Sequence, residues 1–389
     1  MARDFTLTKY RQLLEKFLAK GYTIMAYEDL FAGNVPQKYL IMRHDVDNLP
    51  LQSLEKAKIE HALGIRTTYY FRIVEESNHP EVIKAIAALG HEIGYHYEDL
   101  SLANNKKKKA IKKIFELKKR PYFNPLIVHV GSIQQLDLLV EEIPEKAKIL
   151  GNTFWPGPLT MVLKKKDSVP NRVTAGKNTV AIRIPNHPVV LQLLQSLDFP
   201  LAAPSANLFG SISPTNANHV ATYFQNDLQM ILDGGNCQKG IESTIIGFEN
   251  NEPILYRLGS LSIEDIENSI GKVQIKNNNE KSPDAPGMLS RHYAPKTPTL
   301  LEEDVATLVN KNKEKKIGLL LFDKPLETEI IYHQEILSKN SDLKEAAANL
   351  YAALHRLDKM NLDIIIAQEF PNHSLGKSIN DRLTRATKK

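Results

Sequence analysis

The sequence is nearly free of cysteine, because Cys237 is the only one among 389 residues. A single thiol excludes an internal disulfide framework and any metal site made of thiolates alone. Long apolar runs are also absent, since no stretch approaches the roughly 20 residues that a membrane-spanning helix needs. The opening residues, Met1 to Thr6, have no apolar segment behind their charges, which argues against a secretory signal. These absences predict a soluble, cytoplasmic protein with no membrane partner.

A strong excess of charge of either sign is missing as well. Lysine and arginine number 50 and aspartate and glutamate number 45, which gives a formal net charge of +5. This mild basicity suits polyanionic ligands such as nucleotides or RNA, but it is too small to identify one. Hydrophobic residues make up 42% of the chain, and a chain of this length is expected to form two or three domains.

The first segment, residues 1–105, alternates helical and strand patterns. Its expected elements are helices at 10–18, 50–63 and 80–89 and strands at 39–42, 67–73 and 92–96. Such alternation is typical of βαβ units with parallel strands. We therefore expect a partial βαβ segment at the N-terminus.

Two further α/β regions follow, joined by a polar linker at 281–299. The larger region, 106–280, begins with a helix that ends at Leu117. It continues with apolar runs of strand length at 126–130, 159–163, 179–184, 201–203, 229–232 and 243–247. The smaller region, 300–389, contains an expected strand at 316–322, a helix at 343–357 and a strand at 362–366. The predicted fold class is α/β throughout.

Polar residues gather at strand ends and turns of the larger region, where α/β proteins place groups that contact ligands. Lys118 and Arg120 lie at a helix end, shortly before the strand that carries His129. Ser205 and Asn207 follow another apolar run, and a spacing of two can direct both side chains to one ligand. Each residue alone has a plain structural explanation, such as an ion pair, a core histidine or a turn. Their combination favours a site for an anionic ligand.

Six stretches of this region resemble, in order and spacing, the YrdC-like threonylcarbamoyl-AMP synthases. They are Lys118 to His129, Phe154 to Thr160, Val180 to Pro185, Pro204 to Asn207, Gly240 to Ile245 and Leu255 to Gly259. The linker from Pro286 to Pro295 and the tail from Gly376 to Leu383 are similar to the long form of the family, which has an additional C-terminal domain. The resemblance covers about Ala110 to Lys389.

The resemblance implies a fold and a reaction. The fold is a YrdC-like twisted mixed sheet with helices, followed by a small C-terminal α/β domain. The reaction condenses L-threonine, bicarbonate and ATP into L-threonylcarbamoyl-AMP and pyrophosphate, for the threonylcarbamoyladenosine modification of tRNA. The threonine amine captures CO2 as a carbamate, whose carboxylate attacks the α-phosphorus of ATP. Mg²⁺ is expected with ATP, and double-stranded RNA or tRNA and tRNA-modification proteins are possible partners.

The family match also implies roles for single residues. Lys118 and Arg120 are the catalytic candidates, because cations neutralise the triphosphate and the departing pyrophosphate. The nucleotide-contacting positions are Arg120, Asn124, Thr179, Ser205, Asn207, Ser213 and Arg257. The threonine-contacting positions are His129, Arg183, Ala203 and Ser243. The carbamate and the mixed anhydride formed in this reaction hydrolyse readily, so the site needs a cover that excludes water. The candidate cover is the linker stretch Arg291, His292 and Tyr293.

The chain departs from the family at its start. Members carry a Pro-Thr-Glu-Thr-Val-Tyr-Gly-Leu-Gly stretch that supplies a strand and a threonine to the pocket, and residues 94–105 read differently. The preceding motifs, Arg43 to Asp47 and Gly90 to Tyr97, are instead similar to NodB-like polysaccharide deacetylases. That resemblance offers Asp45, Asp47 and His96 as weak candidate metal ligands. The second histidine is absent, because Leu100 stands four residues after His96.

Both resemblances therefore stop at the same place. We interpret the chain as a threonylcarbamoyl-AMP synthase fused to a truncated deacetylase segment, by fusion of two truncated genes or by an assembly error. Two alternatives remain open at this point. One is a metal-dependent deacetylase that uses the N-terminal segment, and the other is a nucleotide- or RNA-binding protein without turnover.

Overall fold

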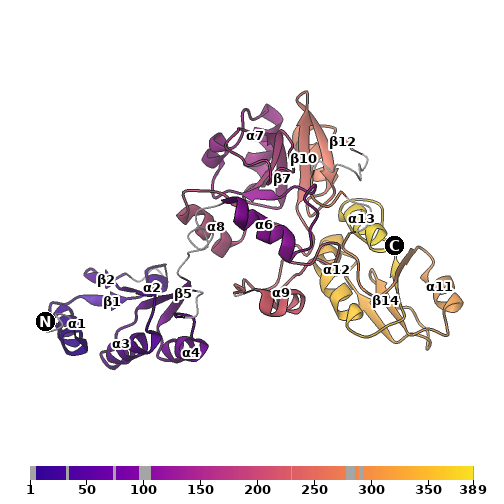
Figure 1. Cartoon of the computed structure of the whole chain (residues 1–389). Coiled ribbons are helices and arrows are strands. Elements are labelled where there is room, and N and C mark those ends of the chain that lie inside the picture. The colour runs from indigo at the N-terminus through magenta and orange to yellow at the C-terminus, as the bar shows by residue number, and fades with distance from the viewer. Residues whose placement is uncertain are drawn as a thin grey trace. The chain divides into compact units, whose positions relative to one another are not determined.

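The computed structural model describes residues 6–31, 35–72, 76–95, 107–228, 230–276, 285–288 and 292–388. The chain divides into two compact units, 1–110 and 111–389, shown from indigo to yellow along the chain in Figure 1. Helices and strands alternate in both units, which confirms the α/β fold class. Among the described residues, no helix is both long enough and apolar enough to cross a membrane.

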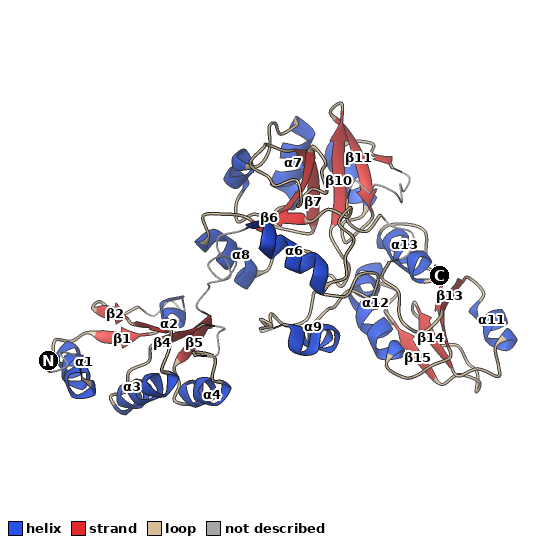
Figure 2. Cartoon of the chain, viewed as in Figure 1, coloured by secondary structure: helices blue, strands red, loops and turns tan. Residues whose placement is uncertain are grey.

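The first unit is built on parallel strands. These are β1 (Thr23–Met25), β2 (Tyr39–Ile41), β3 (Arg43–Val46), β4 (Thr68–Phe71) and β5 (Glu92–Tyr95), with β1 paired to β2 and the order β3-β4-β5 beside them. The helices are α1 (Leu7–Ala19), α2 (Tyr27–Phe31), α3 (Pro50–Ala62) and α4 (Pro80–Ala88). Pro50 and Pro80 begin their helices, where a missing N–H costs nothing. Figure 2 shows α3 and α4 on one side of these strands and α2 on the other.

The second unit begins with a mixed seven-stranded sheet in the order β12-β11-β10-β7-β8-β6-β9. Its strands are β6 (Ile127–His129), β7 (Leu159–Lys164), β8 (Thr179–Arg183), β9 (Leu201–Ala202), β10 (Thr244–Glu249), β11 (Glu252–Arg257) and β12 (Gln274–Ile275). The surrounding helices are α6 (Lys107–Leu117), α7 (Glu145–Phe154), α8 (Pro188–Ser196), α9 (Ala217–Phe224) and α10 (Ile263–Ile270), with 3₁₀ turns at Ile133–Leu138 and Gln225–Asp227. β6 and β8 are parallel, whereas β7 and β8 are antiparallel.

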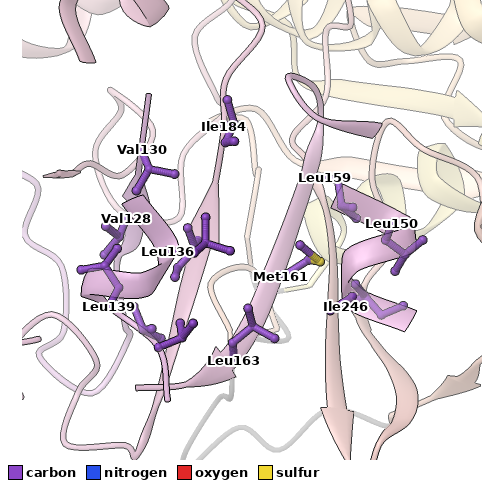
Figure 3. Packing of buried hydrophobic residues seen from close by; sticks show 14 of the residues in the cluster. Val128, Val130, Leu136, Leu139, Leu150, Leu159, Met161, Leu163, Ile184 and Ile246 are labelled. Carbon is purple, nitrogen blue, oxygen red and sulfur yellow. The ribbon is translucent and has the colours of Figure 1, made fainter. Parts of the chain in front are cut away.

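The core of this sheet lies against α7. Leu159, Met161 and Leu163 of β7 pack with Leu150 of the helix and Ile246 of β10, and Figure 3 shows these side chains converging between the elements. Five successive residues of β7 are buried, as is expected for a central strand covered on both faces. This rigid centre fixes the strand ends on which the polar residues lie.

One predicted strand is wrong, and several strands were missed, among them β1, β11 and β12. Residues 230–232 of the expected strand 229–232 have no strand structure, and Leu232 is 69% exposed, so the apolar run has no sheet to join; Gln229 lies outside the described residues. In contrast, β11 returns from β10 through a two-residue turn at Asn250 and Asn251, both with positive φ. Asparagine tolerates that conformation, which suits a tight hairpin.

The C-terminal part has a parallel four-stranded sheet in the order β13-β16-β14-β15. Its strands are β13 (Thr299–Glu302), β14 (Ile317–Leu321), β15 (His333–Ile336) and β16 (Ile364–Gln368), and its helices are α11 (Val305–Lys311), α12 (Leu343–Asp358) and α13 (Leu375–Ala386). Alternate residues of β14 face α11 on one side and α12 with α13 on the other. The α12–α13 side also packs on Ile241 and Tyr293, which brings this sheet's helices next to the larger sheet.

Candidate functional site

A cavity of about 230 Å³ lies where several strand ends of the second unit meet. Its lining includes nine of the residues singled out in the sequence: Arg120, His129, Arg183, Ala203, Ser205, Ser243, Arg257, His292 and Tyr293. Parallel pairing explains part of this convergence, because His129 at the end of β6 is in register with Arg183 at the end of β8. Residues far apart in the chain therefore share one hollow, as the sequence predicted.

Three arginines in this cavity, the buried Arg120 and Arg257 and the half-buried Arg183, are held by uncharged acceptors. Arg120 donates from Nη2 to Asn124 Oδ1 and to the Pro125 carbonyl, both at 2.7 Å. Arg183 donates from Nε to the Gly157 carbonyl at 2.9 Å. Arg257 donates to the Ser243 carbonyl at 3.1 and 2.7 Å and to the Pro286 carbonyl at 3.1 Å. These contacts fix the guanidinium groups without neutralising them.

The cavity is consequently electropositive. Burial lowers the pKa of Arg120 to about 10, and burial together with the charge of Arg257 lowers the pKa of Arg183 to about 10. Both groups are still protonated at neutral pH. Within the described part of the chain, none of the three arginines forms an ion pair with a carboxylate. Uncompensated buried cations are costly, so this arrangement favours an anionic ligand.

Glu242 is the one carboxylate among the described residues that line the cavity. It accepts hydrogen bonds from Ser213 Oγ at 2.5 Å, from Tyr351 Oη at 3.0 Å and from Arg382 Nε at 3.0 Å. Burial would raise the pKa of Glu242, but Arg382 and then Arg257 hold it below the usual value. Its charge is therefore matched by an arginine of α13.

The sequence analysis missed Glu242, Tyr351 and Arg382 as parts of the site. Tyr351 and Arg382 lie 109 and 140 positions from Glu242 in the chain, so no local spacing connects them. The available signal for Glu242 and Arg382 was their presence in the stretches quoted for the family resemblance, Gly240 to Ile245 and Gly376 to Leu383, whereas Tyr351 lies outside both stretches.

One side of the cavity carries neutral polar groups. Ser243 Oγ lies 2.8 Å from Thr160 Oγ1 and accepts from Arg257 Nη2 at 3.0 Å. Burial, and next the charge of Arg183, lowers the pKa of His129 to about 4, so this imidazole is neutral. Its Nδ1 has no hydrogen-bond partner among the described residues. A small ligand could contact a hydroxyl and a neutral imidazole here.

Five of the predicted site residues do not line the cavity: Lys118, Asn124, Thr179, Asn207 and Ser213. Thr179 begins β8, at the end of that strand opposite to Arg183. Ser213 reaches the cavity only through Glu242.

The other three support the loops around the cavity. Lys118 Nζ donates to the carbonyls of Ser205 and Asn207. Asn207 Nδ2 donates to the carbonyls of Leu208 and Ser211 at 3.0 and 2.9 Å. The Asn124 amide is fully buried against Arg120. These side chains hold cavity-lining groups in place.

The linker supplies another wall. His292 and Tyr293 line the cavity, whereas Arg291 lies outside the described residues. Burial lowers the pKa of His292 to about 3, so the ring is neutral. Gly287 has φ +85, and a Cβ there would lie 2.4 Å from Tyr293 Oη and 2.8 Å from Arg257 Cδ. The linker backbone therefore approaches Arg257 more closely than any larger residue would permit.

Two of the three metal candidates of the first unit, Asp45 and Asp47, each lie beside an arginine. Asp45 pairs with Arg43 at 2.6 Å, Asp47 lies 4.0 Å from Arg72, and His96 is outside the described residues. Among the residues that are described, no group of three His, Cys, Asp or Glu side chains could hold a metal ion.

Comparisons with known proteins agree with this geometry. The Sua5_yciO_yrdC family model, described as "Telomere recombination", matches residues 100–259, and the model described as "Threonylcarbamoyl-AMP synthase, C-terminal domain" matches residues 261–387. The first match begins before Ala110, where the motifs alone placed the start. Residues 1–99 lie outside both matches.

Individual relatives cover most of the chain. A threonylcarbamoyl-AMP synthase of Pyrococcus abyssi is 39% identical over 299 residues, which is 73% of this chain and 86% of the relative. Another from Bacillus subtilis is 38% identical over 325 residues, or 80% of this chain and 94% of the relative. The crystal structure of P. abyssi Sua5 complexed with L-threonine superposes with a TM-score of 0.67 at 39% identity, covering 72% of this chain and 85% of that one.

Proposed function

This chain belongs to the threonylcarbamoyl-AMP synthase family, and from that premise we propose that the cavity of Arg120, Arg183 and Arg257 is where it joins its substrates. The reaction combines L-threonine, bicarbonate and ATP into L-threonylcarbamoyl-AMP and releases pyrophosphate. The observation that carries the proposal is the set of three arginines with uncharged partners, two of them buried and Arg183 half-buried, because this chemistry must bring two anions together.

The proposed division of labour follows from charge. The carbamate carboxylate of threonine attacks the α-phosphorus of ATP, and the bond to the pyrophosphate oxygen breaks. Arg120 and Arg257 would bind the phosphates and stabilise the charge that develops on pyrophosphate, which is an electrostatic rather than an acid–base role. Arg183 would bind the threonine carboxylate, because the terminal nitrogens of its guanidinium can form a bidentate pair.

Neutral groups complete the proposed threonine subsite. Ser243 and His129 would contact the polar atoms of threonine, and Ala203 leaves space beside them. Ser205, which also lines the cavity, would contact the nucleotide. Lys118, Asn124 and Asn207 would act on the nucleotide through the loops that they hold, whereas Thr179 stands at the other end of β8.

The part of the chain that the structure describes builds no site that fits Mg²⁺. The described residues contain no group of three metal-binding side chains, and Glu242 is already bonded to Ser213, Tyr351 and Arg382. We propose that Mg²⁺ arrives with ATP, because this ion usually keeps several waters and is held largely by substrate phosphates.

The linker is the proposed cover of the site. His292 and Tyr293 form one wall of the cavity, and water must be excluded because a carbamate and a mixed anhydride hydrolyse readily. We also propose that the product serves tRNA modification in the cytosol, with tRNA and its modifying proteins as partners.

The proposed domain division is 106–280 for the catalytic domain, 281–299 for the linker and 300–389 for the C-terminal domain. The packing of α10 supports a boundary after residue 280. Ile263 and Ile266 belong to the same core cluster as Leu150 of α7, so α10 packs with the larger sheet.

The test of the proposed function is pyrophosphate release by the full chain. Release that requires threonine, bicarbonate and ATP together supports the proposal, and omission of any one should abolish it. ATP binding without product would instead support a binding module without turnover. Arg183→Met should strongly reduce pyrophosphate release at a given threonine concentration while the chain remains folded.

A second hypothesis, a metal-dependent deacetylase in the first unit, is supported only by the motifs around Asp45 and His96. Metal-stimulated acetate release from an acetylated polysaccharide would favour it. No release with Mn²⁺, Co²⁺ or Zn²⁺ would end it.

A further inference from the structure

Glu242 lines a cavity that is proposed to bind anions, yet its side chain is hydrogen-bonded to residues that do not line that cavity. Two of its partners come from the C-terminal part, where Tyr351 lies on α12 and Arg382 on α13, each 3.0 Å from Glu242 Oε2. The third partner, Ser213 Oγ, binds Oε1 at 2.5 Å. The C-terminal part thus holds the only acidic group of the described cavity lining.

Arg382 is fixed on several sides. Its side chain is fully buried, its Nη2 donates to the Leu258 carbonyl at 2.6 Å, and its Nη1 donates to Asp381 at 2.5 Å. The guanidinium also lies over the Tyr293 ring, with its central carbon 4.7 Å from the ring centre. Arg382 therefore cannot follow Glu242 into the cavity.

The charges explain why this restraint matters. Arg257 is near enough to Glu242 to lower the pKa of that carboxyl, and Arg257 itself donates only to uncharged atoms of Ser243 and Pro286. A carboxylate released from Arg382 would have Arg257, which lines the same cavity, as an alternative partner. An ion pair between Glu242 and Arg257 would cancel the positive charge that an anionic substrate requires.

We propose that Arg382 is a positioning residue of the substrate cavity, which holds the Glu242 carboxylate against the C-terminal part and so leaves Arg257 available to the phosphates of ATP. This inference rests on the proposed role of Arg257 in ATP binding. It gives the C-terminal domain a direct effect on substrate affinity, exerted through one buried carboxylate.

The experiment is a double-mutant cycle on the full chain, with Arg382→Gln, Glu242→Gln and the double variant. We expect R382Q to raise the KM for ATP about tenfold, equivalent to about 1.4 kcal/mol, because the freed Glu242 occupies Arg257. We expect the double variant to have the KM of E242Q to within about threefold, because Arg382 acts on ATP binding only through the Glu242 carboxylate. The kcat should change far less than the KM, because the chemical groups remain in place.

A matched control is available in the same part of the chain. Arg356 and Glu335 form a comparable arginine–carboxylate pair at 2.6 Å, and neither lines the cavity. Arg356→Gln should leave the KM for ATP unchanged, even though it also removes one charge of a partly buried ion pair.

The outcomes separate this inference from the proposed function. If the wild-type chain forms no product, the proposed function fails. If the wild type is active but R382Q keeps its KM, or the double variant is as impaired as R382Q, the positioning role is overturned. If R382Q does not fold, the KM for ATP of E242Q is compared with that of the double variant. Equal values support the positioning role of Arg382, and a higher value in the double variant refutes it.

Discussion

Arg257 donates two hydrogen bonds to the backbone of Ser243 and one to its side chain. Nε and Nη2 lie 3.1 and 2.7 Å from the Ser243 carbonyl, and Nη2 lies 3.0 Å from Oγ. This contact joins the end of β11 to the start of β10, so a proposed phosphate-binding cation and a proposed threonine-binding hydroxyl are set side by side. A substitution of Ser243 can therefore be tested for its effect on the KM for ATP as well as on the KM for threonine.

Ser243→Ala tests which substrate the hydroxyl serves. The variant keeps the carbonyl that orients Arg257, so we expect the KM for threonine to rise about tenfold while the KM for ATP stays within about threefold. Thr160→Val is the matched control, because it removes the other end of the 2.8 Å contact without removing a cavity-lining group. Initial rates at saturating second substrate measure both constants. Equal effects on the two substrates would contradict the assignment.

Arg183→Lys tests recognition of the threonine carboxylate. Lysine keeps the charge but loses the planar fork, so we expect the KM for threonine to rise about 10- to 100-fold. Arg172→Lys is the control, since Arg172 lies over the Tyr122 ring outside the cavity. Threonine titrations of pyrophosphate release give the result. A wild-type KM in the Arg183 variant would place the carboxylate elsewhere.

Gly287→Ala tests whether the linker must lie close to Arg257. The new methyl group would meet Tyr293 Oη and Arg257 Cδ, so we expect kcat/KM to fall on the order of 10- to 100-fold. Gly271→Ala is a close match, because Gly271 has φ +81 but nothing within 4 Å of the added Cβ. Both variants should lose about 1 kcal/mol of stability from the backbone strain. An equal loss of activity in both would show that the contact is unimportant.

Lys118 predicts a pH dependence of stability. Burial, and next the charge of Arg120, lowers its pKa from 10.5 to about 7 in the folded chain. Between pH 7 and 10.5 the unfolded state therefore binds more protons, so the free energy of unfolding should rise with pH in that window. Lys118→Gln should remove this increase while its amide still donates to the Ser205 and Asn207 carbonyls.

Thermal unfolding midpoints from pH 7 to 10 measure the Lys118 effect. Lys166→Gln is the control, because Lys166 is exposed and its Nζ also donates to a backbone carbonyl, that of Asp137 at 2.6 Å. The same slope in wild type and in the Lys118 variant would mean that Lys118 stays charged in the folded chain.

Periodicity predicted the strands that form the centre of the fold. The run at 159–163 became β7, because its five successive residues, four of them apolar, can be buried on both faces. The same reasoning failed at 229–232. An apolar run does not have to be buried in a sheet, and here Leu232 is exposed to solvent. β1 was missed because three residues carry too little pattern to recognise.

The candidate site was predictable where side chains lie at strand ends, as His129 and Arg183 do. The site was not predictable where polar side chains form hydrogen bonds to other residues of the chain instead of facing the cavity. The Asn207 amide was expected to contact a ligand, but it donates to carbonyls of its own turn. The pairing of Glu242 with Arg382 depends on how the C-terminal helices pack, and no local sequence pattern records that packing.

The most direct test is a crystal structure of the full chain with L-threonine and a non-hydrolysable ATP analogue. The account predicts the threonine carboxylate at Arg183, the phosphates at Arg120 and Arg257, and the Glu242 carboxylate still on Arg382. Ligands bound outside this cavity, or an ATP analogue without contact to either Arg120 or Arg257, would contradict it.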